Sequence, residues 1–166
     1  MREEIRTERL VLTPLQVSDA ADMVEVLADP ALYEFTGGEP PSLEDLTSRY
    51  RAQVAGPSDG EELWYNWILR PVVGPVAVGF VQASVIGKEA DLAWVVGTPW
   101  QGQGFATEAA AAMKVRLAET GTQHFEAHVH PGHTASHRVA SAIGLSRTGE
   151  IDDDNEEIWA AQPTSR

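Results

Sequence analysis

The stretch Asp91-Leu-Ala-Trp-Val-Val-Gly-Thr-Pro-Trp-Gln-Gly-Gln-Gly-Phe-Ala-Thr-Glu-Ala109 says most about the fold. It predicts a strand, then a glycine-rich turn over residues 97–104, then an alanine-rich helix over residues 105–118. Gly102 and Gly104 have no Cβ, so consecutive backbone N–H groups of the turn can point at one anion, and the following helix adds its dipole. This arrangement suits a phosphate group, although the glycine spacing alone fits an ordinary tight turn equally well.

The residues before this stretch predict a strand, two helices and a run of further strands. Residues 7–15 alternate as a strand, and apolar positions at helical spacing follow over residues 17–29, with Ser18 as the expected N-cap. A second helix with its own serine cap is expected over residues 42–56. Between residues 63 and 96, three extended segments separated by turns predict an antiparallel meander.

The residues after the stretch predict a strand, a helix and two more strands. Residues 124–130 alternate as a strand, and residues 135–143 form a short helix that ends at a glycine. Two weaker strands are expected over residues 147–151 and 156–161. The order of elements predicts one mixed α/β domain that spans residues 1–166.

Composition limits the classes of function. The charged N-terminus does not resemble a secretory signal, and no apolar run reaches the roughly 18 residues of a membrane helix, so we expect a soluble, cytoplasmic protein without a membrane partner. The absence of cysteine excludes a disulfide, a thiolate zinc site and a cysteine nucleophile. A formal charge of −13 disfavours nucleic acid and either favours cationic small molecules or serves ordinary solubility.

Three motifs carry a family resemblance. The string Gln101-Gly-Gln-Gly-Phe-Ala106 resembles the Gln/Arg-x-x-Gly-x-Gly/Ala pyrophosphate loop of the GNAT superfamily of N-acetyltransferases. Thr7-Glu-Arg-Leu-Val-Leu resembles the opening of the Rim-type ribosomal-protein acetyltransferases, and Ala135-Ser-His-Arg-Val-Ala-Ser-Ala-Ile-Gly-Leu resembles their penultimate helix. The resemblance covers nearly the whole chain. It implies a mixed, largely antiparallel sheet with a splayed central strand pair and about four helices.

The resemblance also implies where acetyl-CoA binds as co-substrate. The pantetheine arm is expected between the splayed strands, and Ser136 is expected to face the sulfur, with its role as proton donor the weaker claim. The family usually has Asn in place of His133, and often a Tyr in the late helix as the acid, where this chain offers Ser136 and Ser141. Catalytic roles are thus expected for Ser136 and Val95, and cofactor contacts for Trp94, Val95, Val96, Gly97, Gln101, Gly102, Gln103, Gly104, Phe105, Ala106, Thr107, His133 and Ser136.

The activity implied by the resemblance is direct transfer of an acetyl group to a primary amine of a cationic small molecule or a peptide N-terminus. The alternatives are a catalytically weak CoA-binding sensor or interaction module, and an enzyme with a longer acyl donor. Candidates for the base are Asp91, Glu126 and His130. The acidic run over residues 152–157 either faces the acceptor site or forms a solvated turn. The sequence leaves the oligomeric state open, a homodimer included.

The histidines and tryptophans raise further alternatives. All five histidines lie between His124 and His137, a density that prompts a metal hypothesis. No His-Glu-x-x-His motif is present and the family uses no metal, so we expect none. His133 is instead expected near the cofactor, and His137 on the exposed face of the late helix. Most tryptophans are expected in the core, with Trp64 or Trp67 as candidates for the acceptor pocket.

Overall fold

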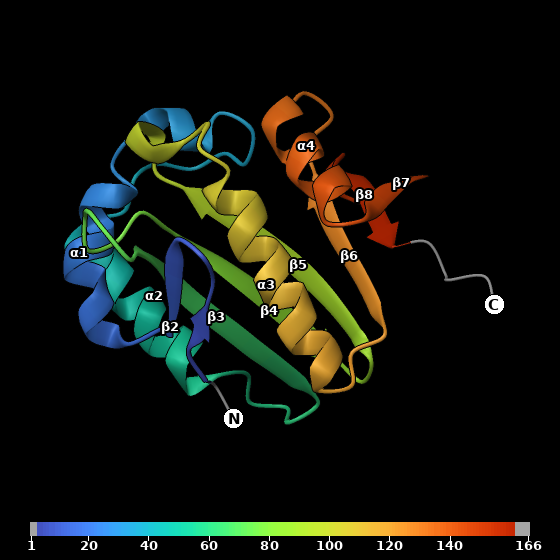
Figure 1. Ribbon diagram of the computed structural model, residues 1–166, viewed down its shortest axis with the longest axis horizontal. Helices are drawn as coiled ribbons and strands as arrows, with labels where there is room; N and C mark the ends of the chain where they lie inside the picture. Colours follow the sequence, from blue (N-terminus) through green and yellow to red (C-terminus); the bar gives the residue numbers. More distant parts are fainter. Residues whose placement is uncertain (1–2, 162–166) are drawn as a thin grey trace.

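An eight-stranded sheet with the order β1-β2-β3-β4-β5-β6-β8-β7 organises the chain (Figure 1). The structure is a computed structural model that describes residues 3–161. Residues 1–2 and 162–166 of the expected domain lie outside the described residues. Among the described helices, none has both the length and the apolar character needed to cross a membrane.

The elements follow one another as the sequence predicts, with short 3-10 turns between some of them. The first half contains β1 (Ile5–Arg6), β2 (Leu10–Pro14), α1 (Ala20–Val26), α2 (Leu43–Ala55), β3 (Glu62–Pro71), β4 (Gly79–Ile86) and β5 (Glu89–Val96). The second half contains α3 (Phe105–Glu119), β6 (His124–Val129), α4 (Thr134–Ala142), β7 (Leu145–Ile151) and β8 (Glu157–Ala161). The mixed α/β fold, the largely antiparallel sheet and the four α-helices are thereby confirmed.

Two local expectations at the N-terminal end need correction. The strand expected over residues 7–15 is present but shorter, as β2, and residues 7–9 form the turn that connects it to the additional strand β1. Ser18 is not the N-cap of α1, because it lies inside the 3-10 turn Val17–Asp19. Asp19 is the N-cap residue of α1, but its carboxylate does not cap that helix; it accepts a hydrogen bond from the backbone N–H of Gln16, before the 3-10 turn, at 2.8 Å. The serine cap of α2 is correct, since Ser42 Oγ accepts from the N–H of Asp45.

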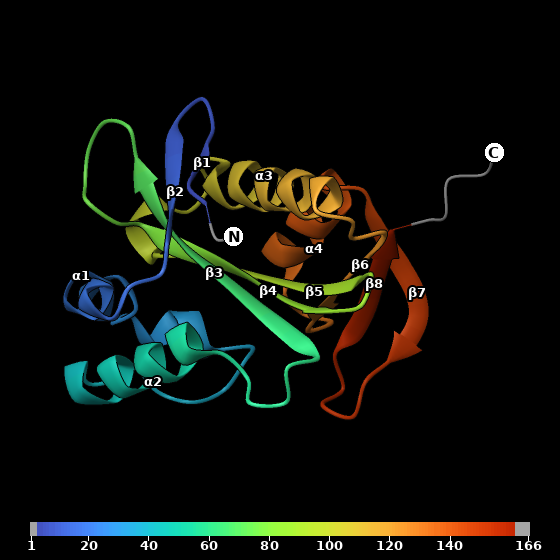
Figure 2. The same ribbon diagram turned by 90° about the horizontal axis from the view of Figure 1, so that it is seen from below.

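Helices cover both faces of the sheet (Figure 2). The reason is the alternation of side chains along the central strands. Leu92 of β5 packs on the face covered by the alanine-rich side of α3, where Ala109 and Met113 are fully buried. Val95 of β5 points to the other face, and packs in the cluster that α1 and α2 form with the sheet. One strand thus presents different residues to two separate layers.

Among the strands of residues 3–161, the central β5 and β6 are the one parallel pair, and they pair over a short distance only. Their register joins Glu89 to His124, Ala90 to Phe125 and Asp91 to Glu126. Beyond Asp91 the two strands no longer pair, although β5 stays paired with β4 along its whole length. The edge of β5 that faces β6 is therefore open from Leu92 onward, which is the splay that the family resemblance implies.

A partly buried ion pair ties α1 to the sheet. Asp19 Oδ1 accepts from Arg70 Nη2 at 2.6 Å, and the Asp19 side chain is 10% exposed. Arg70 also donates to Thr13 Oγ1 at 2.9 Å and to the carbonyl of Val76 at 3.0 Å. Loss of the Asp19 carboxylate would leave the guanidinium without its closest anion in a partly desolvated place.

We expect Asp19→Ala to lower the free energy of unfolding by about 3 kcal/mol, because it removes the closest anion of Arg70 and leaves the N–H of Gln16 without its acceptor. Asp22→Ala is the matched control. Asp22 lies 3.8 Å from the same arginine but its side chain is 49% exposed, so its loss is expected to cost less than about 1 kcal/mol. Urea denaturation followed by circular dichroism measures both. Equal losses in the two variants would contradict this assignment.

Candidate functional site

The glycine turn delivers the end of β5 directly to the start of α3. Gly102 and Gly104 both adopt left-handed backbone conformations, with φ of 77° and 82°. Gly104 is the N-cap of α3, and no side chain caps this end of the helix. The first N–H groups of α3 therefore have no side-chain partner and are available to an anion. A glycine is required here because a left-handed conformation strains residues with a Cβ.

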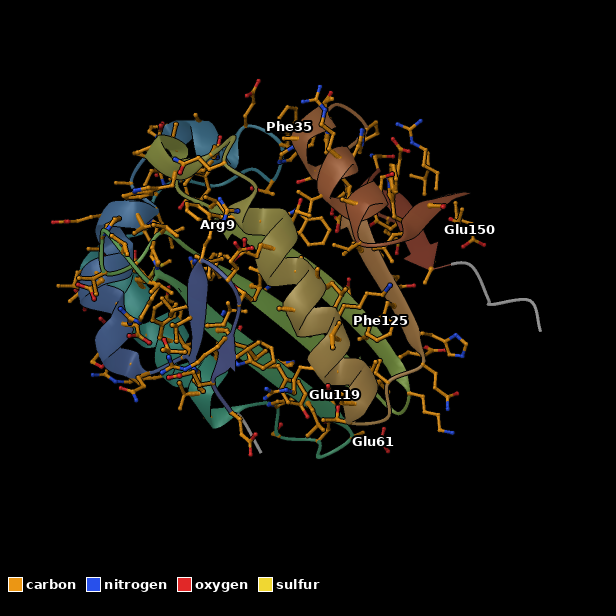
Figure 3. All side chains as sticks on the ribbon, viewed as in Figure 1. Arg9, Phe35, Glu61, Glu119, Phe125 and Glu150 are labelled. Atoms are coloured by element: carbon orange, nitrogen blue, oxygen red, sulfur yellow. The ribbon has the colours of Figure 1, made fainter. Side chains whose placement is uncertain are left out.

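An arginine from the β1–β2 hairpin braces this turn (Figure 3). Arg9 Nη1 donates to the carbonyl of Gln103 at 2.7 Å, and Arg9 Nε donates to Glu108 Oε1 at 2.8 Å. Glu108 also accepts from Thr7 Oγ1 at 2.6 Å. Desolvation raises the pKa of Glu108, but the hydrogen bonds from Thr7 and Arg9 outweigh it and lower that pKa below its usual value. The sequence alone predicts no role for Arg9, although the string Thr7-Glu-Arg contains it.

The backbone at the end of β5 is partly occupied within the protein. Gln101 turns its side chain back, and its Nε2 donates to the carbonyl of Val96 at 2.9 Å. The N–H of Gly97 donates to the carbonyl of Val78 at 2.7 Å. Of the four residues expected to contact the pantetheine arm, Val96 and Gly97 thus each already use one backbone group, which fixes the strand end in position.

Trp94, His133 and Ser136 form a cluster where β5 and β6 have separated. Trp94 Nε1 donates to Ser136 Oγ at 3.3 Å, across 42 residues of sequence. The N–H of Ser136 donates to His133 Nδ1 at 3.3 Å, and His133 Nε2 lies 3.2 Å from Ser136 Oγ. Burial lowers the pKa of His133, so its imidazole is neutral near pH 7. Because Nδ1 accepts, the proton lies on Nε2, which donates to Ser136 Oγ. With two donors directed at Oγ, the serine hydroxyl is free to donate elsewhere.

A cavity opens on the other face of β5. Its volume is about 270 Å³, and it lies over β3, β4 and β5 on the side of the sheet that carries α2. Its lining consists of Gln53, Trp64, Asn66, Gln82, Ala83, Ser84, Asp91 and Ala93. Trp64 is thus the tryptophan of this cavity, whereas the indole of Trp67 is buried on the opposite face and donates to the carbonyl of Glu3.

Asp91 is the carboxylate in the wall of this cavity. Burial raises the pKa of Asp91 to about 6, with a further upward contribution from the negative charge of Glu126 and a downward one from His128. Asp91 remains exposed to the cavity, so the desolvation comes from the strands behind the carboxylate rather than from a closed pocket. A carboxyl group with this pKa is still mostly ionised at neutral pH and exchanges protons readily there.

His128 links Asp91 to the acidic run over residues 152–157. His128 Nδ1 lies 2.6 Å from Asp152 Oδ2, and Nε2 lies 2.9 Å from Glu126 Oε1. Desolvation lowers the pKa of His128, but these hydrogen bonds outweigh it and raise that pKa to about 9. His128 is therefore an imidazolium at neutral pH. Asp152 also holds the turn itself, through hydrogen bonds to the N–H groups of Asp154 and Glu156, so the run is partly a structural turn and partly a neighbour of the cavity.

The histidines do not converge on one place. Of the candidate bases, Asp91 and Glu126 come together, whereas His130 contacts Phe35 and accepts from the N–H of Gly132 at 2.9 Å. His133 stacks on the same Phe35 ring, with 4.7 Å between the ring centroids. The group of possible metal ligands that includes a histidine combines His128 with Asp91 and Glu126.

The expectation that His137 lies on the exposed face of the late helix is wrong. Its side chain is 12% exposed and stacks on Trp159, with 5.3 Å between the ring centroids. His137 Nε2 lies 3.1 Å from the carbonyl of His130. Helical spacing alone places His137 outside, and the sequence does not show that Trp159 of β8 covers this side of α4.

Comparison with solved structures finds the same architecture in other proteins. A GNAT-family acetyltransferase from Bacillus anthracis is 20% identical, with a TM-score of 0.74, and the match covers 95% of this chain and 96% of that one. A Vibrio cholerae protein described as a ribosomal-protein-serine acetyltransferase is 17% identical, with a TM-score of 0.77 over 97% and 98% of the two chains. The aminoglycoside acetyltransferase AAC(6')-Ib, in complex with coenzyme A, is 17% identical, with a TM-score of 0.76 over 93% and 95%.

Two comparisons of the sequence, with curated proteins and with family models, complete this result. No curated protein matches the chain. The family model of the acetyltransferase (GNAT) domain matches residues 9–146, a range that contains the glycine turn, the separated strands and the serine of α4. The chain therefore belongs to the GNAT family of acetyl-CoA-dependent acetyltransferases.

Proposed function

We propose that this protein transfers the acetyl group of acetyl-CoA directly to a primary amine of a cationic small molecule or a peptide N-terminus. The observation that carries the proposal is the separation of β5 from β6 beyond Asp91. Ser136 lies at this separation on one face, and the cavity with Asp91 opens on the other. A donor and an acceptor placed on the two faces meet at the same stretch of β5. The opening string and the late helix favour the Rim-type subgroup.

The donor is proposed to bind along the turn and the open edge of β5. The pyrophosphate takes the free N–H groups of the turn and of the first turn of α3, over residues 101–107. The pantetheine arm lies along residues 94–97, where β5 no longer pairs with β6. The hydroxyl of Ser136 donates to the sulfur. His133 acts through Ser136 by directing a donor at its oxygen.

The chemistry then depends mainly on alignment. The neutral amine attacks the carbonyl carbon of the thioester, the C–N bond forms, and the C–S bond breaks as the thiolate leaves with a proton. A backbone N–H near Val95 stabilises the developing oxyanion. The acceptor amine reaches the site as an ammonium ion, so a base must first remove one proton. Asp91 is the proposed base, because it lies in the cavity wall and its pKa is raised to about 6.

We expect Gly104→Ala to raise the dissociation constant of acetyl-CoA about tenfold or more. A Cβ at φ of 82° strains the turn and would lie 3.3 Å from the guanidinium of Arg9. Gly74→Ala is the control, because Gly74 also has a left-handed φ, of 116°, but lies in the β3–β4 loop. Calorimetric titration measures both variants. If the two variants bind acetyl-CoA equally well, the turn does not hold the pyrophosphate.

We expect kcat/KM for the amine to fall on the acidic side of a pKa of about 6, because protonated Asp91 no longer accepts a proton. Asp91→Asn should reduce kcat/KM about 100-fold or more and remove this limb of the pH profile. Glu126→Gln is the matched comparison, since Glu126 lies beside Asp91. Thiol release followed from pH 5 to pH 9 gives the profiles. A limb that persists in Asp91→Asn and disappears in Glu126→Gln would move the role to Glu126.

We expect Ser136→Ala to lower kcat by about tenfold to 100-fold while the dissociation constant of acetyl-CoA changes little, because the departing thiolate loses its donor. Ser141→Ala, at the exposed serine of the same helix, should leave kcat unchanged. Thiol release under saturating acetyl-CoA measures kcat. Tight binding of acetyl-CoA without thiol release for any amine, in the unmodified protein, would favour the alternative of a CoA-binding sensor or interaction module.

A further inference from the structure

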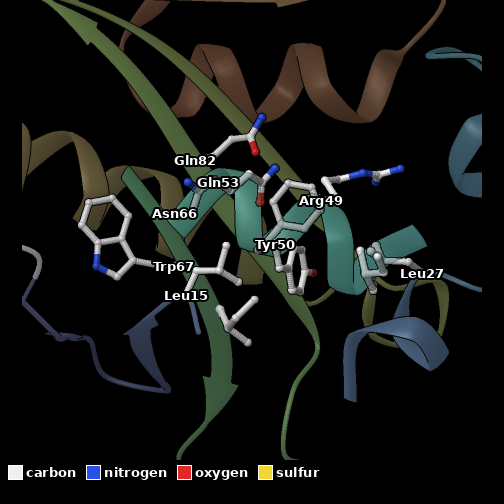
Figure 4. Close-up of a pocket in the computed structure, with 11 residues that line it drawn as sticks. Leu15, Leu27, Arg49, Tyr50, Gln53, Asn66, Trp67 and Gln82 are labelled. Atoms are coloured by element: carbon white, nitrogen blue, oxygen red, sulfur yellow. The ribbon is translucent and has the colours of Figure 1, made fainter. Parts of the chain in front are cut away.

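A second, smaller cavity of about 30 Å³ (Figure 4) lies next to the cavity of Asp91 and shares part of its lining. Three carboxamide side chains line both cavities, those of Gln53, Asn66 and Gln82. They form a bridge between the two, and we call the combined space the α2 groove. Asp91 lines only one end of this groove, and Arg49 with Tyr50 lines only the other.

Four polar side chains along the groove have no hydrogen-bond partner among the described residues. Among residues 3–161, no hydrogen bond engages the side-chain amides of Gln53, Asn66 or Gln82. The hydroxyl of Tyr50 is buried without a partner, in a residue that is 4% exposed. Unpaired polar groups in such a place cost free energy unless a ligand or water satisfies them. Their concentration in one groove indicates a place for a polar ligand with several donors and acceptors.

The charges at the two ends of the groove are opposite. Arg49 extends from α2 at the edge of the smaller cavity (Figure 4), and no carboxylate of the described residues lies within ion-pair distance of it. This is notable in a chain with 25 acidic and 12 basic residues. The other end holds Asp91, with Glu126 beside it. A ligand that matches this groove therefore carries a positive group at one end and a negative group at the other.

We propose that the α2 groove binds a dipolar acceptor, whose amine lies at Asp91 and whose carboxylate or other anionic group lies at Arg49. A neutral spacer that carries amide or hydroxyl groups pairs with Gln53, Asn66 and Gln82 between the two ends. The inference rests on the proposed function, because it takes the Asp91 end as the place of acetyl transfer. It narrows the acceptor to amines with a distant anion and excludes polyamines that carry only positive groups.

The spacing of the strands sets the length of the spacer. Ser84 of β4 lies opposite Asp91, and Phe80 of β4 lines the smaller cavity, so the two ends are separated by four residues of a strand. Four residues of an antiparallel strand span about 13 Å. An extended peptide advances about 3.5 Å per residue, so peptides of roughly three to four residues place an N-terminal amine and a C-terminal carboxylate at this distance.

The test compares alanine peptides of two to four residues that carry either a free C-terminal carboxylate or a C-terminal amide. The two forms have the same amine and differ only in the anion. Binding to the protein saturated with CoA is measured by calorimetry, which does not depend on turnover. We expect the best carboxylate form to bind about tenfold or more tightly than its amide, and kcat/KM to show the same preference.

Arg49→Gln should reduce this ratio to near one and leave binding of the amide form unchanged. Arg51→Gln is the matched control, because Arg51 is exposed on the same helix and does not line the groove; it should keep the full preference. Equal binding of the two forms, binding of neither, or a preference that survives Arg49→Gln would overturn the proposal. The proposed function fails separately, when acetyl-CoA binds but no amine, with or without an anion, releases the thiol.

Discussion

The limited pairing of β5 with β6 is the constraint on which the site depends. Three residue pairs join the strands, and beyond Asp91 the edge of β5 is left without a partner strand. An open strand edge in the middle of a sheet leaves backbone donors and acceptors unsatisfied, and packing elsewhere must offset that cost. Here the two halves of the sheet are held together by α3 and α4, whose buried residues share one cluster with both strands. The gap is preserved because the helices bridge it.

Alternation along β5 separates the donor from the acceptor. Trp94 points to the face of α3 and α4, where it holds Ser136, and Asp91 points to the face of α2, where the cavity lies. Placing the donor and the acceptor on opposite faces also reduces electrostatic repulsion of the donor, because a chain of charge −13 repels a molecule that carries phosphates. Arg9, the cation that braces the turn, is itself paired with Glu108. The turn therefore relies on free backbone N–H groups rather than on net positive charge, while the carboxylates of Asp91 and Glu126 lie on the acceptor face.

The elements that depend on local sequence patterns could be predicted, whereas the contacts between residues far apart in the sequence could not. The glycine turn, α3, the β3–β4–β5 meander and the cap of α2 each depend on neighbours within a few residues, so the sequence predicts them. Arg9 and Glu108 lie 99 residues apart, and nothing in either segment points to the other. The same holds for His137 and Trp159, whose stacking buries a residue that helical spacing alone places outside. Ser136 was expected near the cofactor by resemblance, but its bond to Trp94 requires the fold.

His128 explains how an acidic turn far along the chain takes part in the site. Its imidazolium is hydrogen-bonded to Glu126 and Asp152, and these bonds raise the pKa of His128 to about 9. That positive charge lowers the pKa of Asp91, while burial and Glu126 raise it, and the balance leaves the pKa at about 6. Without the imidazolium, the same burial would raise the pKa of Asp91 further. The carboxyl group would then be more often protonated at neutral pH and unable to accept a proton. The acidic turn thus acts on Asp91 in two ways: Asp152 and Glu156 raise its pKa directly, and the hydrogen bond from Asp152 helps to keep the positive charge on His128 that lowers it.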